Sequence, residues 1–305
     1  MRRHPQRMLH YGAIPMALAT VVTGIVGFRF HELNNSILYI AWAVWWISVA
    51  LAWAAAVLLI YLAISRATRS IEAVTGAWLL LVAPLTVCAA AGGTLAEYLP
   101  SGAAYTTLVC SYCLAGAGVP LTCCVVVLYV HRIAVYKLPA HDAILTAFIP
   151  LGPVAQIGVA VLTLGSVAQD LLPQVLPEAV GLGSVLFGLG IVTGLLSWGS
   201  ALFWAMHAVF AVVYQRRSAC VPFNISWWAL TFPMGVFATL TAGLGDALEL
   251  NFFRVCFLLL VVLLVVLWLF NIVRTAAGLW TGAIFDIPGL MATYDSDTSC
   301  AASSV

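Results

Sequence analysis

The polar side chains that could act on a solute in this chain are few and almost all uncharged. Between the ends of the long apolar segments they are one amide and six hydroxyls: Gln156, Thr20, Thr23, Thr86, Thr163, Thr231 and Thr239. No acidic residue lies deep enough in a segment to relay protons, which argues against a tightly binding pump. Neutral hydrogen-bonding groups release an ion readily, as conduction requires. These side chains therefore favour a path for a small anion.

Four leading prolines recur on alternate apolar segments and predict where such a path runs. Pro120, on an intervening segment, is the exception to the alternation. Pro15, Pro84, Pro150 and Pro233 are 69, 66 and 83 residues apart, and Pro153 follows the third. Proline removes a backbone donor, so inside lipid it is tolerated where the freed carbonyls meet protein or water. We expect these four segments to be kinked and to face an aqueous path. Backbone donors beyond each kink carry partial positive charge, which favours anions.

Small residues follow each leading proline in a repeated pattern. Two positions later come Ala17, Thr86, Gly152 and Gly235, and eight to ten positions later come Gly24, Gly92, Gly158 and Gly243. Small residues let helices approach closely in lipid. The repeated unit is a helical hairpin, with its kinked helix inside and its straight helix outside. The alternative is that prolines are simply frequent in membrane helices.

Composition identifies the chain as an all-α integral membrane protein. Of 305 residues, 64% are hydrophobic and 8% charged, and the mean hydropathy is +1.08. The segments long enough to cross a bilayer number eight, near 12–28, 36–64, 75–96, 104–130, 143–166, 181–214, 224–245 and 254–282. We expect one transmembrane domain over 1–290, built of four hairpins around a central pore, and a disordered cytosolic tail over 291–305. A signal peptide at the start is disfavoured because Pro15 interrupts its apolar run.

Basic residues predict the orientation. One side carries ten of them: Arg2, Arg3, Arg7, Arg66, Arg69, Arg132, Lys137, Arg216, Arg217 and Arg274. The other side carries only Arg29 and Arg254. Since cytoplasmic loops are enriched in Lys and Arg, both termini are expected in the cytosol.

Cysteine and histidine residues do not indicate catalysis or metal binding. Cys110, Cys113, Cys123 and Cys124 share one span, with no His or acidic partner nearby. Cysteine there behaves as a small hydrophobic residue. No nucleophile motif or metal-ligand spacing is present in any span or loop. We therefore expect no enzyme activity, no cofactor, no metal site and no nucleic-acid partner.

Three segments carry a family resemblance: FNISWWALTFPMGVF at 223–237, FIPLGPVAQ at 148–156 and YGAIPMALATVVTG at 11–24. They resemble the tellurite-resistance/dicarboxylate transporter family, which includes the plant slow anion channels. Within it, Trp227, Trp228 and the FFRV sequence at 252–255 look most like the fungal sulfite efflux pumps. The resemblance implies hairpins around a central pore, association as homotrimers with one pore in each protomer, and a phenylalanine that plugs the pore. By motif position that residue is Phe232. The expected pore-lining residues are Pro15, Thr20, Pro84, Thr86, Pro150, Gly152, Pro153, Gln156, Thr231, Pro233 and Gly235.

The chain departs from this family in its number of spans. The family has ten, and residues 4–20 are similar to its third span, so the opening hairpin is expected to be missing. We favour a truncated gene over a divergent paralogue, because an open-sided pore would expose kinked backbone to lipid.

The expected function is sulfite efflux across the plasma membrane. The alternatives are transport of a carboxylate such as malate, which the same family carries, and a non-conducting paralogue that assembles with a full-length homologue. The expected partners are a small inorganic anion or carboxylate and the lipid bilayer.

Overall fold

A computed structural model describes residues 9–27, 35–65, 74–137, 141–216, 223 and 225–282. Within these ranges every regular element is a helix, and eight segments are long and apolar enough to cross a membrane. The all-α membrane class and the eight spans predicted from the sequence are thereby confirmed. The tail over 291–305 and several basic residues used to predict orientation lie outside the described residues: Arg2, Arg3, Arg7, Arg29, Arg66, Arg69 and Arg217.

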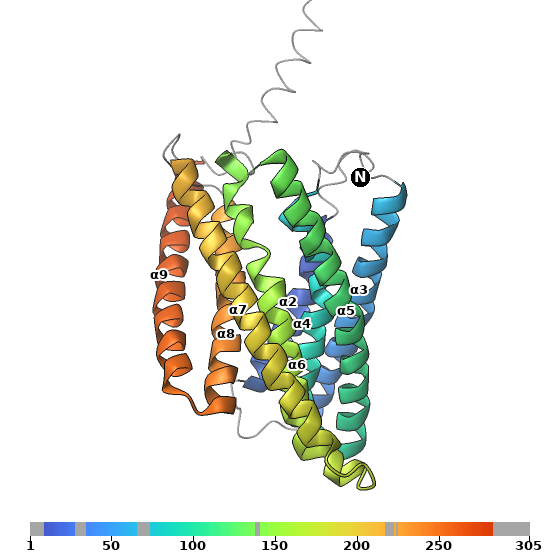
Figure 1. The fold of residues 1–305 in the computed structure, drawn as a ribbon. Helices are drawn as coiled ribbons and strands as arrows, with labels where there is room; N and C mark the ends of the chain where they lie inside the picture. Colours follow the sequence, from blue (N-terminus) through green and yellow to red (C-terminus); the bar gives the residue numbers. More distant parts are fainter. Residues whose placement is uncertain are drawn as a thin grey trace, which may run out of the picture.

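The eight long helices run side by side in one bundle (Figure 1). They are α2 (Ala13–Gly27), α3 (Asn35–Ser65), α4 (Leu79–Ala96), α5 (Ser101–Tyr136), α6 (Leu151–Val175), α7 (Leu182–Arg216), α8 (Thr231–Leu248) and α9 (Asn251–Thr281). Short 3-10 helices precede four of them: η1 (Leu9–Gly12), η3 (Gly76–Trp78), η4 (His141–Phe148) and η5 (Ile225–Leu230).

The four leading prolines belong to α2, α4, α6 and α8, called here the proline-bearing helices, and each of these follows a 3-10 segment. Outside this set, α5 contains Pro120. Pro15, Pro153 and Pro233 are each the third residue of an α-helix, while Pro84 is the sixth residue of α4. In a first turn proline removes an N–H that would have no intrahelical partner, so the helix loses little. In α2, α6 and α8 the expected kink is therefore a junction between 3-10 and α geometry near the start of the span, whereas Pro84 lies inside α4.

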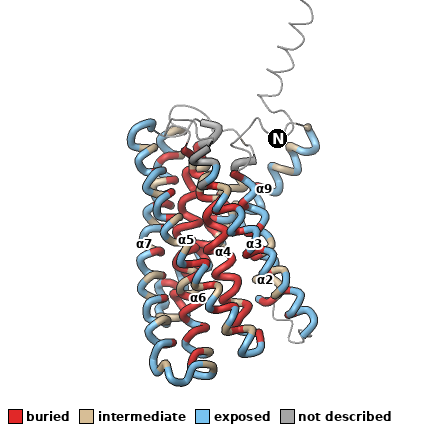
Figure 2. The backbone as a smooth tube through the Cα atoms, turned by 90° about the vertical axis from the view of Figure 1, so that its right-hand side faces the viewer, coloured by how far each residue is buried: buried red, intermediate tan, exposed pale blue. Residues whose placement is uncertain are grey.

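These four helices pack in a row. Helix α2 contacts α4, α4 contacts α6, and α6 contacts α8, whereas α2 and α8 form no close packing with each other. The straight helices cover the row: α3 packs on α2 and α4, α5 on α4 and α6, α7 on α6 and α8, and α9 on α8. Buried residues concentrate along α4 and α6 (Figure 2), and α9 buries only Phe253 and Asn271. The row is an open arc with α4 and α6 at its centre.

Glycines allow the central helices to approach one another. A methyl group on Gly158 would lie 2.8 Å from Cβ of Ser197 on α7 and 2.9 Å from Leu240 on α8. A methyl group on Gly152 would lie 3.3 Å from Cα of Pro233, so α6 and α8 meet at their first turns. Gly24, on the terminal helix of the arc, has no such neighbour within 4 Å. The repeated glycines therefore differ in role with their place in the arc.

Gly158→Ala should lower stability because its methyl group has no room between α7 and α8. Overpacking costs about 1–3 kcal/mol, which exceeds the gain of about 1 kcal/mol from replacing a helical glycine. We expect the thermal midpoint of the purified protein in detergent to fall by a few degrees. The matched control is Gly188→Ala, at a helical glycine of α7 with nothing within 4 Å, which should leave the midpoint unchanged or raise it. Equal midpoints for the two variants would contradict the proposed close approach.

Candidate functional site

A cavity of about 480 Å³ lies along the row of proline-bearing helices. All four helices of the row contribute to its wall, and α9 closes one side with Phe257, Val261 and Leu264. The remaining lining residues are Thr20, Thr23, Val87, Ala90, Ala91, Thr94, Gln156, Val159, Thr163, Phe232, Gly235, Val236, Ala238 and Thr239. None of these lining residues is charged, so the wall combines apolar surface with hydroxyl and amide groups.

Gln156 on α6 is the most buried polar group of this wall. Its side chain is 6% exposed and makes no hydrogen bond with any residue that the structure describes. Because Gln156 lines the cavity, its free donors and acceptor are available to a solute there.

Phe232 is the largest side chain of α8 in the wall. It is 39% exposed, although Pro233 and Met234 beside it are buried. Pro233 is held against Gly152 of α6, which fixes the backbone next to the ring. The residue before a proline also has a restricted backbone. The ring therefore projects from a rigid point toward the cavity.

The structure brings together some of the residues expected to line a pore and separates others. Thr20, Gln156, Phe232 and Gly235 line the cavity. The following residues do not: Pro15, Pro84, Thr86, Pro150, Gly152, Pro153, Thr231 and Pro233. The methyl group of Thr86 faces Gly118 on α5, and the hydroxyl of Thr231 donates to the Trp228 carbonyl at 2.8 Å. These eight residues lie outside the cavity wall.

Thr94 and three residues of α9 line the cavity although neither was predicted from the sequence. Thr94 stands ten positions after Pro84, as Thr163 stands ten positions after Pro153. Both line the cavity. Polar residues well beyond the proline, such as these two, therefore also indicate the wall.

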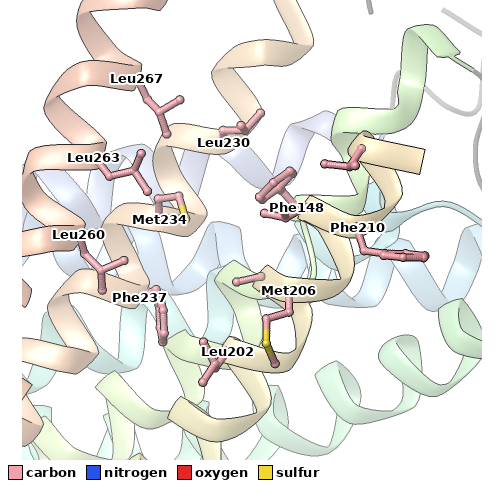
Figure 3. A pocket seen from close by; sticks show the side chains of 13 residues that line it. Phe148, Leu202, Met206, Phe210, Leu230, Met234, Phe237, Leu260, Leu263 and Leu267 are labelled. Carbon is pink, nitrogen blue, oxygen red and sulfur yellow. The ribbon is translucent and has the colours of Figure 1, made fainter. Parts of the chain in front are cut away.

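A second pocket, of about 660 Å³, lies between α7, α8 and α9 (Figure 3). Its wall includes Phe148, Met206, Phe210, Met234 and Leu263, and no lining residue is polar. An anion there would lose hydration without gaining a hydrogen bond from a side chain. A third pocket, between α5 and α7, is bounded largely by the outer helices. The cavity along the row is thus the candidate path.

Charged groups lie near helix ends and not in the cavity wall. Glu97 directly follows α4, and its carboxyl pKa is raised, first by burial and then by the negative charge of Asp170 on α6. At the end of α5, Arg132 donates to the carbonyl of Lys137 at 2.7 Å. The described residues contain no group of three His, Cys, Asp or Glu side chains that could hold a metal ion.

Comparison with known proteins places this geometry in a family. The family model SLAC1, described as a voltage-dependent anion channel, matches residues 1–276. The sulfite efflux pump SSU1 of Trichophyton rubrum is 34% identical over 257 residues, which cover 84% of this chain and 67% of that protein. SSU1 of Arthroderma benhamiae gives the same values. SSU1 of Arthroderma otae is 33% identical over 247 residues, covering 80% and 64%. The resemblance seen in the sequence is confirmed, and the chain spans about two thirds of the length of these relatives.

Cysteines that replace cavity residues should react with small water-soluble thiol reagents if the cavity holds water. In a background without native cysteines, we expect labelling at Thr20→Cys and Thr239→Cys, and slower labelling at the more buried Gln156→Cys. Two positions serve as controls: Thr86, which is fully buried, and Val57, which is 61% exposed on the outer helix α3 and would face lipid. Mass spectrometry of reconstituted protein gives the labelled fraction. Equal labelling of cavity and control positions would exclude a water-filled cavity.

Proposed function

Because the chain belongs to the SLAC1 family of voltage-dependent anion channels, we propose that it exports sulfite through the cavity along its row of proline-bearing helices. The similarity to pumps named for sulfite supports this choice of solute. We propose further that the protein acts in the plasma membrane as a homotrimer. The distribution of basic residues supports an orientation with both termini in the cytosol.

The uncharged cavity wall is the observation that carries this proposal. An anion entering it meets the Gln156 amide and threonine hydroxyls, and no lining side chain carries a positive charge that would retain it. Weak, distributed hydrogen bonding is what rapid passage needs. The same wall offers nothing to neutralise the two carboxylates of malate, so it favours a small inorganic anion over a dicarboxylate.

Phe232 is proposed as the gate of this path. Its ring is apolar, lies in the cavity wall and is fixed by the adjoining Pro233. It narrows the path, and it offers no hydrogen bond to replace the lost hydration of an ion. In this proposal, the eight expected pore residues that lie outside the cavity wall set the spacing of the helices.

Phe232→Ala should increase anion flux per folded molecule, because it removes both the steric and the dewetting barrier. The measurement is sulfite release from vesicles reconstituted with a known amount of monodisperse protein. Phe237→Ala is the control, since Phe237 is 4% exposed and packs on Trp198 with ring centroids 5.7 Å apart. Its loss should cost about 3–5 kcal/mol of stability and reduce folded yield without raising flux. A folded Phe232→Ala protein with unchanged or reduced flux would refute the gate.

Expression in cells that lack their own exporter should raise sulfite tolerance and leave malate uptake unchanged. Sulfite released into the medium and labelled malate taken up are measured in the same cells. Malate uptake without sulfite release would move the protein to carboxylate transport. If neither solute moves, even with Phe232→Ala, the chain does not conduct by itself.

A further inference from the structure

Four of the five threonine hydroxyls that line the cavity already donate their proton to a backbone carbonyl of their own helix. Thr20 donates to the Met16 carbonyl at 2.9 Å and Thr23 to the Ala19 carbonyl at 3.1 Å. On other helices of the row, Thr94 donates to the Ala90 carbonyl at 3.3 Å, and Thr239 to the Gly235 carbonyl at 3.0 Å. A carbonyl can only accept, so the direction of each bond is fixed. The oxygen lone pairs of these four hydroxyls are what the solute meets.

Side-chain donors remain only on α6 among the described lining residues. Gln156 keeps both amide N–H groups, and Thr163 makes no hydrogen bond within the described part of the chain. They are seven residues apart and hence lie on one face of the helix. At about 1.5 Å rise per residue, roughly 10 Å separates them along the axis. One wall of the cavity can donate, and α2, α4 and α8 accept.

We propose that the cavity selects monoanions that carry an acidic proton, of which hydrogensulfite is the example. The Gln156 amide donates to an anion oxygen, while a threonine oxygen of α2 or α8 accepts the proton of the anion. This inference rests on the proposed anion transport and names the protonation state that moves.

A proton-free anion fits this wall less well. Chloride or the sulfite dianion would lie against hydroxyl lone pairs, and a threonine could turn its proton toward the ion only by giving up its bond to the helix. Hydrogensulfite has acceptor oxygens for α6 and one proton for the opposite wall. Each group of the solute then meets a complementary group of the protein.

The test compares chloride and sulfite flux in vesicles containing the full chain, over a pH range that spans the second ionisation of sulfurous acid. Sulfite flux should follow the concentration of hydrogensulfite and fall as pH rises. In Thr20→Val/Thr239→Val, methyl groups replace two acceptor oxygens, and the ratio of sulfite to chloride flux should fall about fivefold, the effect of one lost hydrogen bond. The Ser variants at both positions should restore the ratio.

Two further variants separate donor from acceptor effects. Gln156→Leu should reduce the flux of both anions about tenfold, as expected for a lost hydrogen bond to a charged group, and Gln156→Asn should reduce it less. Thr106→Val is the matched control, since Thr106 donates to the Gly102 carbonyl at 3.0 Å on the exposed face of α5, away from the cavity. It should change neither flux nor ratio.

The two proposals can fail separately. Sulfite flux that is independent of pH, or a flux ratio that is unchanged in the valine double variant, overturns selection for a protonated anion and leaves transport standing. No flux of either anion in any folded variant, including Phe232→Ala, overturns both.

Discussion

Hydrocarbon offers no hydrogen bonds, so every peptide group within the bilayer must find its partner in the protein. This constraint explains how the structure accommodates prolines in three of its spans. Pro15, Pro153 and Pro233 stand in the first turn of an α-helix, where a missing N–H costs little. The chain before them is bonded as a 3-10 helix: the Ile149 amide donates to the Thr146 carbonyl at 3.0 Å, and the Gly152 amide to the Ile149 carbonyl at 3.2 Å. The row of inner helices follows from this arrangement, because each junction packs beside the next.

The same constraint revises the origin of polarity in the cavity. Backbone donors freed by kinks were expected to favour anions, but the amide of Gly152 is engaged by the turn before it. Polarity in the wall comes instead from side chains about one to three turns further on, such as Gln156 and Thr94. The cavity is therefore built from regular helix surface, and its chemistry depends on which residue types occupy one stripe of each helix.

Much of the fold was predictable from the sequence, but less of the candidate site was. Hydropathy identifies spans because the bilayer sets their length, and prolines mark the inner helices because few positions in a membrane tolerate them. The wall depends on helix rotation, which local sequence does not determine. Thr86 and Thr94 stand eight residues apart on α4, yet Thr86 packs on Gly118 of α5 and Thr94 faces the cavity. Neighbouring helices decide this rotation through contacts such as the bond from the Trp45 indole to the Cys88 carbonyl at 2.9 Å.

The length of η4 has a mechanical consequence. Its eight residues exceed the three or four usual for a 3-10 helix, and they lead through Ile149 and Pro150 into α6. A 3-10 helix rises about 2.0 Å per residue and an α-helix about 1.5 Å. If η4 rewound into α geometry, the segment would shorten by roughly 4 Å, about three quarters of the rise of one helical turn. Because α6 continues from this segment, the position of the Gln156 amide along the cavity depends on η4 keeping its 3-10 geometry.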